Sequence, residues 1–216
     1  MSRFRAVLFD MDGVLVDSED HWNRVWREEV FARVEEGEPT LAEVTGRNYR
    51  ESLAEIDEAY GLPGGPERFE RRFETAADAV YGEAVSLTPG VPDLLDALRE
   101  RGLAVGVVSS APEAWIRTVV GRFDLDPLDV VVSAEHLDGP GKPAPGIYER
   151  AADALGVAPD DCVVIEDSEN GVRAAARADA TVVRFRRGGD AAPTPGTDAI
   201  AADPAELRGT LLDLVG

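Results

Sequence analysis

Cysteine and lysine are almost absent from this 216-residue chain, which contains one cysteine, Cys162, and one lysine, Lys142. A single cysteine cannot form an internal disulfide, nor can it supply the several thiolates of a structural zinc site. No apolar run approaches the roughly 20 residues that span a bilayer, and the amino terminus shows no signal-peptide cleavage pattern. We therefore predict a cytoplasmic protein without a membrane partner.

Positive charge is scarce as well, because 22 basic residues stand against 42 acidic ones and give a formal net charge of −20. Such a surface repels nucleic acid and anionic membranes, so we predict no nucleic-acid partner. An acidic excess with little lysine is similar to the composition of proteins from halophiles, whose molar salt shortens the Debye length to about 3 Å. We interpret the charge as an adaptation to salt and expect a monomer.

Five short apolar runs recur along the chain, and they are nearly continuous, as in strands that are covered on both faces. The runs are residues 6–9, 103–108, 130–132, 162–165 and 181–183. Helical patterns cover residues 91–101, 111–122, 147–155 and 170–177, and a last strand and helix are expected within 199–214. This alternation predicts an α/β fold with a doubly wound parallel sheet.

The interval between the first two runs is too long for a loop and contains helical patterns over residues 21–35, 49–60 and 67–81. We predict that residues 18–86 form a small helical domain inserted after the first strand. Residues 1–17 and 87–216 then form the core domain, and the two crossings between the domains are hinges. A loop rich in glycine, over residues 188–196, is expected at the surface.

Polar side chains follow four of the predicted strands, where open α/β sheets bind their ligands. The first strand is followed by Asp10 and Asp12, the second by Ser109 and Ser110, the third, through a loop, by Lys142, and the fourth by Glu166 and Asp167. Carboxylates gathered in this way repel one another unless a cation lies between them, and oxygen ligands near a phosphate suit Mg²⁺. The lone lysine supplies a compact ammonium that can lie between a phosphate and a carboxylate. The sequence therefore predicts a magnesium and phosphate site.

Four segments at these strand ends resemble, in order, the four motifs of the haloacid dehalogenase superfamily. They are Phe9–Ser18 (FDMDGVLVDS), Ser109, Gly141–Pro145 (GKPAP) and Ile165–Gly171 (IEDSENG). The resemblance covers roughly residues 4–185 and points to the subfamily of β-phosphoglucomutase and phosphoglycolate phosphatase. The helical insertion then resembles the type-one cap of that subfamily, a lid that selects the substrate.

The resemblance implies a role for each acidic residue. Asp10 resembles the nucleophile that forms an aspartyl-phosphate, and Asp12 resembles the general acid and base. Mg²⁺ is expected on Asp10, Asp167 and the backbone carbonyl of Asp12, with Glu166 either as a further ligand or as support for the ligands. The implied reaction is hydrolysis of a small phosphorylated metabolite such as a sugar phosphate or phosphoglycolate.

The remaining motif residues are expected to bind phosphate. Ser109 donates to a phosphoryl oxygen together with the backbone N–H groups of Met11, Asp12 and Ser110. Lys142 neutralises the transferring phosphoryl group and holds Asp10. The side chain of Ser110 also fits the N-terminal cap of the helix that follows.

Residues 45–51 of the insertion are predicted to face the site, because paired arginines after a glycine suit a second anionic group. The candidates in this segment are Arg47, Asn48 and Arg50. His21, which lies close to the first motif, is a further candidate. Arginines on a solvated helix face would give the same pattern. The two tryptophans four positions apart, Trp22 and Trp26, are more typical of core packing.

Other functions fit the motifs less well. A β-phosphoglucomutase-like phosphotransferase would use the same core residues, but Trp22 stands where its cap histidine is expected and Arg50 matches only with a shift of one position. Dehalogenases usually lack the second motif-one aspartate, so Asp12 argues against carbon–halogen hydrolysis. A non-catalytic phosphate-binding domain would not need every catalytic position filled, and no Gly-x-Gly-x-x-Gly follows strand one to bind a dinucleotide.

Overall fold

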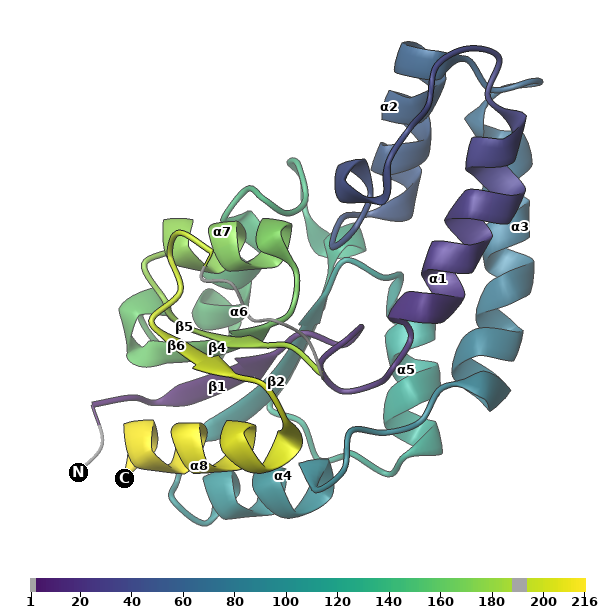
Figure 1. The fold of residues 1–216 in the computed structure, drawn as a ribbon. Helices are drawn as coiled ribbons and strands as arrows, with labels where there is room; N and C mark the ends of the chain where they lie inside the picture. Colours follow the sequence, from purple (N-terminus) through teal and green to yellow (C-terminus); the bar gives the residue numbers. More distant parts are fainter. Residues whose placement is uncertain (1–2, 188–193) are drawn as a thin grey trace.

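The computed structural model describes residues 3–187 and 194–216, and its centre is a six-stranded parallel sheet (Figure 1). The strands lie in the order β3-β2-β1-β4-β5-β6. They are β1 (Ala6–Phe9), β2 (Ala104–Ser109), β3 (Val130–Ser133), β4 (Cys162–Glu166), β5 (Thr181–Phe185) and β6 (Ala199–Ala201). The strand order reverses beside β1, so the predicted doubly wound α/β sheet is confirmed, with its switch point between β1 and β4.

Both faces of the sheet are covered by helices, as the continuous apolar runs predict. Val7 and Phe9 of β1 belong to the core shared with α4, α5 and α8, whereas Leu8 belongs to the core shared with α6 and α7. The five helices are α4 (Val91–Arg99), α5 (Glu113–Arg122), α6 (Gly146–Leu155), α7 (Glu169–Arg177) and α8 (Pro204–Val215). This packing aligns the carboxyl ends of the strands along one edge.

A helical segment connects β1 to β2 and stands beside the sheet with an apolar core of its own around Leu53 and Phe73 (Figure 1). We call residues 19–84 the helical insertion. It comprises α1 (Glu19–Val25), the π-helical turn η1 (Trp26–Val30), the 3-10 turns η2 (Phe31–Arg33) and η3 (Leu41–Glu43), α2 (Tyr49–Tyr60), α3 (Pro66–Ala79) and the π-helical turn η4 (Val80–Ala84). The helix predicted over residues 21–35 runs without a gap through α1, η1 and η2, changes its hydrogen-bond pattern twice and ends at Arg33.

The two chain segments that join the insertion to the sheet are hydrogen-bonded to each other. Val16 forms a bridge with Leu87, and the Thr88 N–H donates to the Leu15 carbonyl at 2.7 Å. The Ser86 N–H donates to the Asp17 carboxylate at 2.5 Å. The insertion is thus attached through a paired segment rather than through two separate linkers.

The sequence predictions differ from the structure in one local feature near the site. Ser110 was expected to cap a helix starting at residue 111, but α5 begins at Glu113, and its N-cap residue, Pro112, has no side chain that could cap it. The Glu113 N–H instead donates to the Glu135 carboxylate at 3.0 Å. The capping role of Ser110 was therefore wrong, because Pro112 delays the start of the helix.

Within the described residues, no helix is both long enough and apolar enough to cross a membrane. Most of the predicted loop over residues 188–196 lies outside the described residues.

Candidate active site at the carboxyl edge of the sheet

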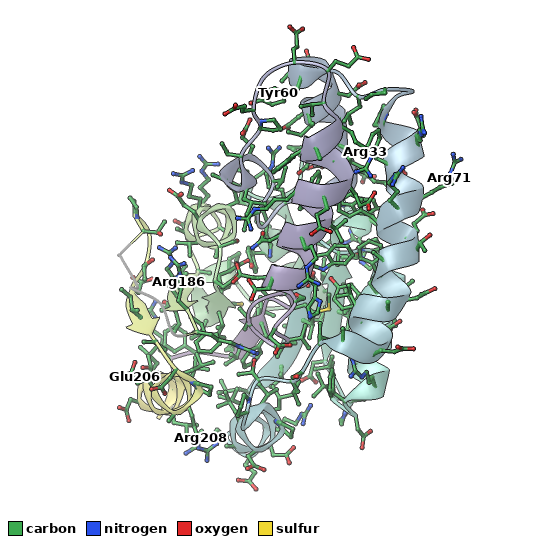
Figure 2. All side chains as sticks on the ribbon, turned by 45° about the vertical axis from the view of Figure 1, so that its right-hand side comes forward. Arg33, Tyr60, Arg71, Arg186, Glu206 and Arg208 are labelled. Atoms are coloured by element: carbon green, nitrogen blue, oxygen red, sulfur yellow. The ribbon has the colours of Figure 1, made fainter. Side chains whose placement is uncertain are left out.

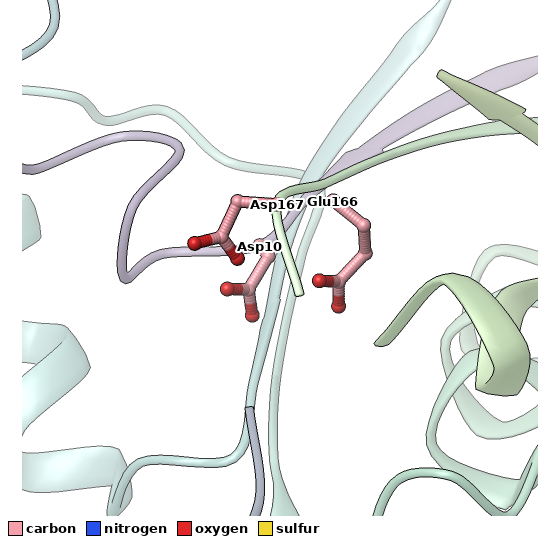
Figure 3. Close-up of side chains that lie close together, drawn as sticks. All are labelled: Asp10, Glu166 and Asp167. Carbon is pink, nitrogen blue, oxygen red and sulfur yellow. The ribbon is translucent and has the colours of Figure 1, made fainter. Parts of the chain in front are cut away.

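Three carboxylates meet where β1 and β4 end (Figure 3). Phe9 pairs with Ile165, so Asp10 lies beside Glu166 and Asp167, and the Asp10 N–H donates to the Ile165 carbonyl at 3.0 Å. One oxygen of each carboxylate lies within 4.8 Å of the others. The structure therefore brings together the acidic residues of the first and fourth motifs, as the sequence predicts.

Lys142 is almost completely buried and lies between two of these carboxylates. Its Nζ donates to Asp10 Oδ1 at 2.7 Å, to Glu166 Oε1 at 2.5 Å and to the Val108 carbonyl at 3.4 Å. Burial alone would lower the pKa of Lys142, but the charges of Asp10 and Glu166 outweigh it and raise that pKa well above its ordinary value. The predicted contact between Lys142 and Asp10 is present.

Both oxygens of the buried Glu166 carboxylate accept hydrogen bonds within the protein. Oε1 accepts from Lys142 and from the Tyr148 hydroxyl, each at 2.5 Å, and Oε2 accepts from Ser168 Oγ at 3.1 Å. A Cβ built on Gly171 would lie 2.0 Å from these oxygens, so only glycine fits the first turn of α7 here. Glu166 thus holds Lys142 in place, a contact that the sequence did not predict, and its two expected roles at a metal stay predictions.

Asp12 lies on the side of the cluster that faces the insertion and is held by two residues from different segments. Its Oδ1 accepts hydrogen bonds from Ser18 Oγ and, at 2.7 Å, from the Tyr81 hydroxyl. The Trp22 indole N–H donates to the same Tyr81 oxygen at 2.9 Å. Burial raises the pKa of Asp12, and the hydrogen bonds from Ser18 and Tyr81 oppose that rise only in part. A carboxyl group that keeps its proton more readily is suited to act as a general acid.

Asp10 and Asp167 are the two acids of the cluster whose surroundings suit a bound cation. Burial raises the pKa of Asp10 to about 8 against the opposing charge of Lys142, and burial together with the charge of Glu19 raises the pKa of Asp167 well above its ordinary value. A Cβ on Gly13, whose φ is +74°, would lie 2.0 Å from Asp167 Oδ2, so the backbone leaves room for this carboxylate. Buried carboxylates are costly to ionise without a cation beside them, and their oxygens are the ligands that a hard divalent cation such as Mg²⁺ prefers.

The predicted phosphate-binding residues border the same edge. Ser109 ends β2, is 1% exposed, and accepts a hydrogen bond from the Ala111 N–H at 3.0 Å. Ser110 Oγ donates to the Gly46 carbonyl of the insertion at 3.3 Å. The Met11 side chain is buried, so any contribution of Met11 to a ligand must come from its backbone.

A cavity of about 100 Å³ lies between this edge and the helical insertion. Its floor contains Asp10, Asp12, Asp167 and both serines. Its walls are aromatic, with Trp22, Trp26, Tyr49, Phe73 and Tyr81 from the insertion and Trp115 from α5. Trp115 stacks on Trp22 at 5.3 Å and on Tyr49 at 5.1 Å between ring centroids, so the aromatic wall joins the insertion to the core.

The four insertion residues predicted to meet the substrate have different positions. Arg47 lines the cavity, but its two terminal nitrogens each bond to the Glu55 carboxylate at 2.5 Å. Asn48 caps α2 and donates to the Ser110 carbonyl at 3.2 Å, so it serves the helix and its attachment.

Neither Arg50 nor His21 lines the cavity, so their contact with a substrate stays a prediction. The Arg50 guanidinium is paired with Glu135 at 2.9 Å and also contacts Glu70 and Glu74, so it lies among acids rather than beside a substrate. His21 precedes Trp22 on α1, and the face of α1 that meets the cavity is the one shared by the two tryptophans.

Several residues of the site carried no usable signal in the sequence. Tyr81 bonds to an aspartate 69 positions away, and Trp115 and Tyr148 look like ordinary core aromatics in their helices. Ser18 could have been found from the sequence, since it lies within the first motif. In the structure it is completely buried.

Comparison with known proteins places the chain among hydrolases. The profile of the haloacid dehalogenase-like hydrolase family matches residues 4–179. A protein of Thermotoga maritima named phosphorylated carbohydrates phosphatase is 33% identical over 177 residues, which cover 79% of each chain. A protein of Mycobacterium bovis named beta-phosphoglucomutase is 31% identical, covering 95% of this chain and 92% of its own length.

The fold has close counterparts among solved structures. A hydrolase from Pseudomonas syringae superposes with a TM-score of 0.81 at 25% sequence identity, covering 98% of this chain and 100% of the other.

Proposed function

The chain belongs to the haloacid dehalogenase-like hydrolase family, and from this membership and its site we propose a Mg²⁺-dependent phosphatase that acts on a phosphorylated carbohydrate. Matches to proteins named as phosphatases make it a phosphomonoester hydrolase. The observation that carries the proposal is the buried contact of Lys142 with Asp10, across the cavity floor from a second aspartate, Asp12.

The first chemical step would take place on Asp10. One carboxylate oxygen of Asp10 attacks phosphorus, the bond from phosphorus to the leaving oxygen breaks, and an aspartyl-phosphate forms. Lys142 donates to Asp10 Oδ1, the oxygen that does not attack, and balances the charge that gathers on the phosphoryl oxygens. Asp12 donates its proton to the leaving oxygen, so the product leaves as a neutral alcohol.

The second step returns the enzyme to its starting state. Asp12, now ionised, accepts a proton from water as that water attacks phosphorus. The bond between phosphorus and Asp10 breaks, and inorganic phosphate is released. The hydrogen bonds from Ser18 and Tyr81 hold one Asp12 oxygen throughout.

The phosphate and the cation would be held by the remaining motif residues. Ser109 and the backbone N–H groups of Met11, Asp12 and Ser110 would bind phosphoryl oxygens. Asp10, Asp167 and the Asp12 backbone carbonyl would hold Mg²⁺, which when bound lowers the repulsion between an anionic nucleophile and an anionic phosphate. Glu166 would act indirectly, by holding Lys142.

We also propose that residues 18–86 act as a lid domain. The support is their separate apolar core and their position over the cavity. The paired segments around Asp17 and Ser86 would then serve as the hinge.

A substrate screen tests the proposed hydrolysis. Phosphate release is measured from a panel of sugar phosphates and from acetyl phosphate, in Mg²⁺ and in a chelator, with Asp10→Asn as the blank. We expect release that requires both Mg²⁺ and Asp10. Release that persists in Asp10→Asn would contradict the aspartyl-phosphate mechanism.

A phosphotransferase of the β-phosphoglucomutase kind is the second candidate, because a relative with that name matches 95% of this chain. Against it stands the cavity, where Trp22 occupies the position expected for a cap histidine and Arg50 is paired with acids. Conversion of β-glucose 1-phosphate to glucose 6-phosphate without net phosphate release would favour the mutase.

A further inference from the structure

Two hydrogen-bond donors at the cavity have no partner within the protein. Arg47 Nε and the Tyr49 hydroxyl are buried, and neither has a hydrogen-bond partner among the described residues. Both residues line the cavity above Asp10. Buried donors are rarely left unpaired in folded proteins, because the loss of their bonds to water is then not compensated. We interpret Arg47 Nε–H and the Tyr49 hydroxyl as donors whose acceptor atoms are supplied by the substrate.

The charge around these donors indicates that the acceptors are neutral. Among the described residues that line the cavity, Arg47 alone has a positively charged side chain, and Glu55 neutralises its two terminal nitrogens. Burial raises the pKa of Tyr49 to about 12, so its phenol stays protonated and can donate. A second phosphate or carboxylate would enter beside Asp12, Glu19 and Asp167 without a cation of its own.

The walls suit the carbon skeleton of a small polyol. Aromatic rings make apolar contact with C–H groups while a few polar atoms fix the orientation of the ligand. The cavity of about 100 Å³ is smaller than the roughly 300–1,000 Å³ of most small-molecule sites, which limits the leaving group in the closed form.

We propose that the enzyme selects monophosphates of uncharged polyols and rejects compounds with a second anionic group. Arg47 Nε–H and the Tyr49 hydroxyl donate to hydroxyl oxygens of the leaving group. Glu55 occupies the terminal nitrogens of Arg47, so these cannot bind a second anionic group of the substrate. The inference rests on the proposed phosphatase function and adds its specificity-determining residues.

The first experiment compares substrates on the wild-type enzyme. The values of kcat/KM are measured for glucose 6-phosphate, glucose 1-phosphate and sorbitol 6-phosphate, and for fructose 1,6-bisphosphate and phosphoglycolate. Acetyl phosphate, which has no hydroxyl, reports on the phosphoryl-transfer residues alone. We expect kcat/KM for the best monophosphate of an uncharged polyol to exceed the values for both compounds with a second anionic group by at least about tenfold, the effect of roughly one lost hydrogen bond to a charged group.

The second experiment removes one donor. Tyr49→Phe is expected to lower kcat/KM for the best polyol monophosphate about tenfold, with a much smaller loss on acetyl phosphate. Tyr60→Phe is the matched control, because Tyr60 lies at the far tip of the insertion and donates to Glu43 (Figure 2). It should keep the wild-type ratio between the two substrates.

The third experiment releases the arginine. Glu55→Gln frees the terminal nitrogens of Arg47 and is expected to raise kcat/KM for fructose 1,6-bisphosphate relative to the best monophosphate at least several-fold. Glu58→Gln, an exposed neighbour on the same helix, should leave the ratio unchanged.

The outcomes separate the inference from the function on which it rests. A wild-type preference for phosphoglycolate or the bisphosphate, or an equal loss by Tyr49→Phe on polyol and acetyl phosphates, overturns the inference while hydrolysis stands. If no compound, acetyl phosphate included, is hydrolysed in an Asp10-dependent way, the proposed function fails and the inference fails with it.

Discussion

At the scale of single residues, the site depends on one ammonium group that is shared by two carboxylates. Lys142 is the only lysine of the chain, and it lies where a compact, fully buried cation contacts Asp10 and Glu166. Everywhere else the fixed positive side chains are arginines. A guanidinium is broader than an ammonium and presents its donors in a plane, so it does not fit this position.

Lys142→Arg is therefore expected to lower kcat by about 10² or more, although the charge is kept, because the donor to Asp10 moves away. The measurement is Mg²⁺-dependent phosphate release from acetyl phosphate. Arg150→Lys, the reverse exchange at an exposed position of α6, serves as the control. Activity near the wild-type value in Lys142→Arg would show that charge alone is needed.

We predict that Tyr81 positions Asp12, because its hydroxyl donates to this carboxyl group. Tyr81→Phe removes one of two hydrogen bonds to Asp12 Oδ1, so the carboxyl group loses its fixed direction. We expect kcat to fall about tenfold while KM changes little, since the phosphate contacts remain. Steady-state kinetics on a sugar phosphate provide the test, and a change confined to KM would speak against this role.

The raised pKa of Asp10 predicts how pH and Mg²⁺ act on stability. Burial raises the pKa of folded Asp10 to about 8, whereas the ordinary value, expected in the unfolded chain, is 3.8. The folded state then binds more protons between these values, so the free energy of unfolding falls as pH rises through this window.

Because Mg²⁺ replaces that proton, its stabilising effect should be larger at pH 8 than at pH 5. The melting temperature is measured with and without Mg²⁺ at both values. In Asp10→Asn the difference between the two pH values should shrink. An equal shift in wild type at both pH values would refute the prediction.

At this scale the sequence predicted where the motif residues lie, but not what surrounds the arginines of the insertion. Asp10, Asp12, Lys142, Glu166 and Asp167 follow buried strands, and parallel strands align their carboxyl ends whatever else the chain does. The insertion has no such alignment, so nothing in the sequence decided which of its arginines would meet the cavity and which would pair with nearby acids.

At the scale of elements, the helical insertion is attached to the sheet by a few polar contacts and the aromatic wall. Asn170 at the start of α7 donates to the Thr45 carbonyl at 2.9 Å, the Gly141 N–H donates to Glu51 at 3.1 Å, and Arg50 pairs with Glu135. These contacts hold the insertion over the cavity. If the insertion is a lid, as we propose, these contacts break when it opens.

If the insertion closes over the cavity, as we propose, Asn170→Ala should weaken this closure without touching the carboxylates of the candidate site. We expect KM for the sugar phosphate to rise several-fold, with a smaller change in kcat, because one net hydrogen bond of the closed form is lost. Limited proteolysis should cut the hinge segments faster than in wild type. Glu149→Ala, at an exposed position of α6, is the control for a general loss of stability.

At the scale of the whole molecule, the net charge of −20 dominates. Carboxylates on one surface repel one another, and this repulsion destabilises the compact state at low ionic strength. The described ion pairs are mostly at the surface and partly exposed, so they offset little of it. Among the residues described, the only ion pairs that are buried on both sides are those of Lys142 with Asp10 and Glu166.

We therefore expect the melting temperature to rise by several degrees between dilute buffer and molar KCl, because salt screens the surface carboxylates. Thermal unfolding followed by circular dichroism at neutral pH provides the measurement. Near the isoelectric point of about 4.4 the effect of KCl should become much smaller. A melting temperature that does not depend on KCl at neutral pH would disprove the interpretation of the charge.

The sequence by itself determined the α/β sheet, the position of the insertion and the order of the four motifs. Each of these follows from short-range patterns, since apolar runs form strands and the residues after them lie at one edge. The tertiary structure decided what surrounds the candidate site. Tyr81 reaches Asp12 across 69 positions and Arg50 reaches Glu135 across 85, and such contacts exist only because the insertion folds back over the sheet.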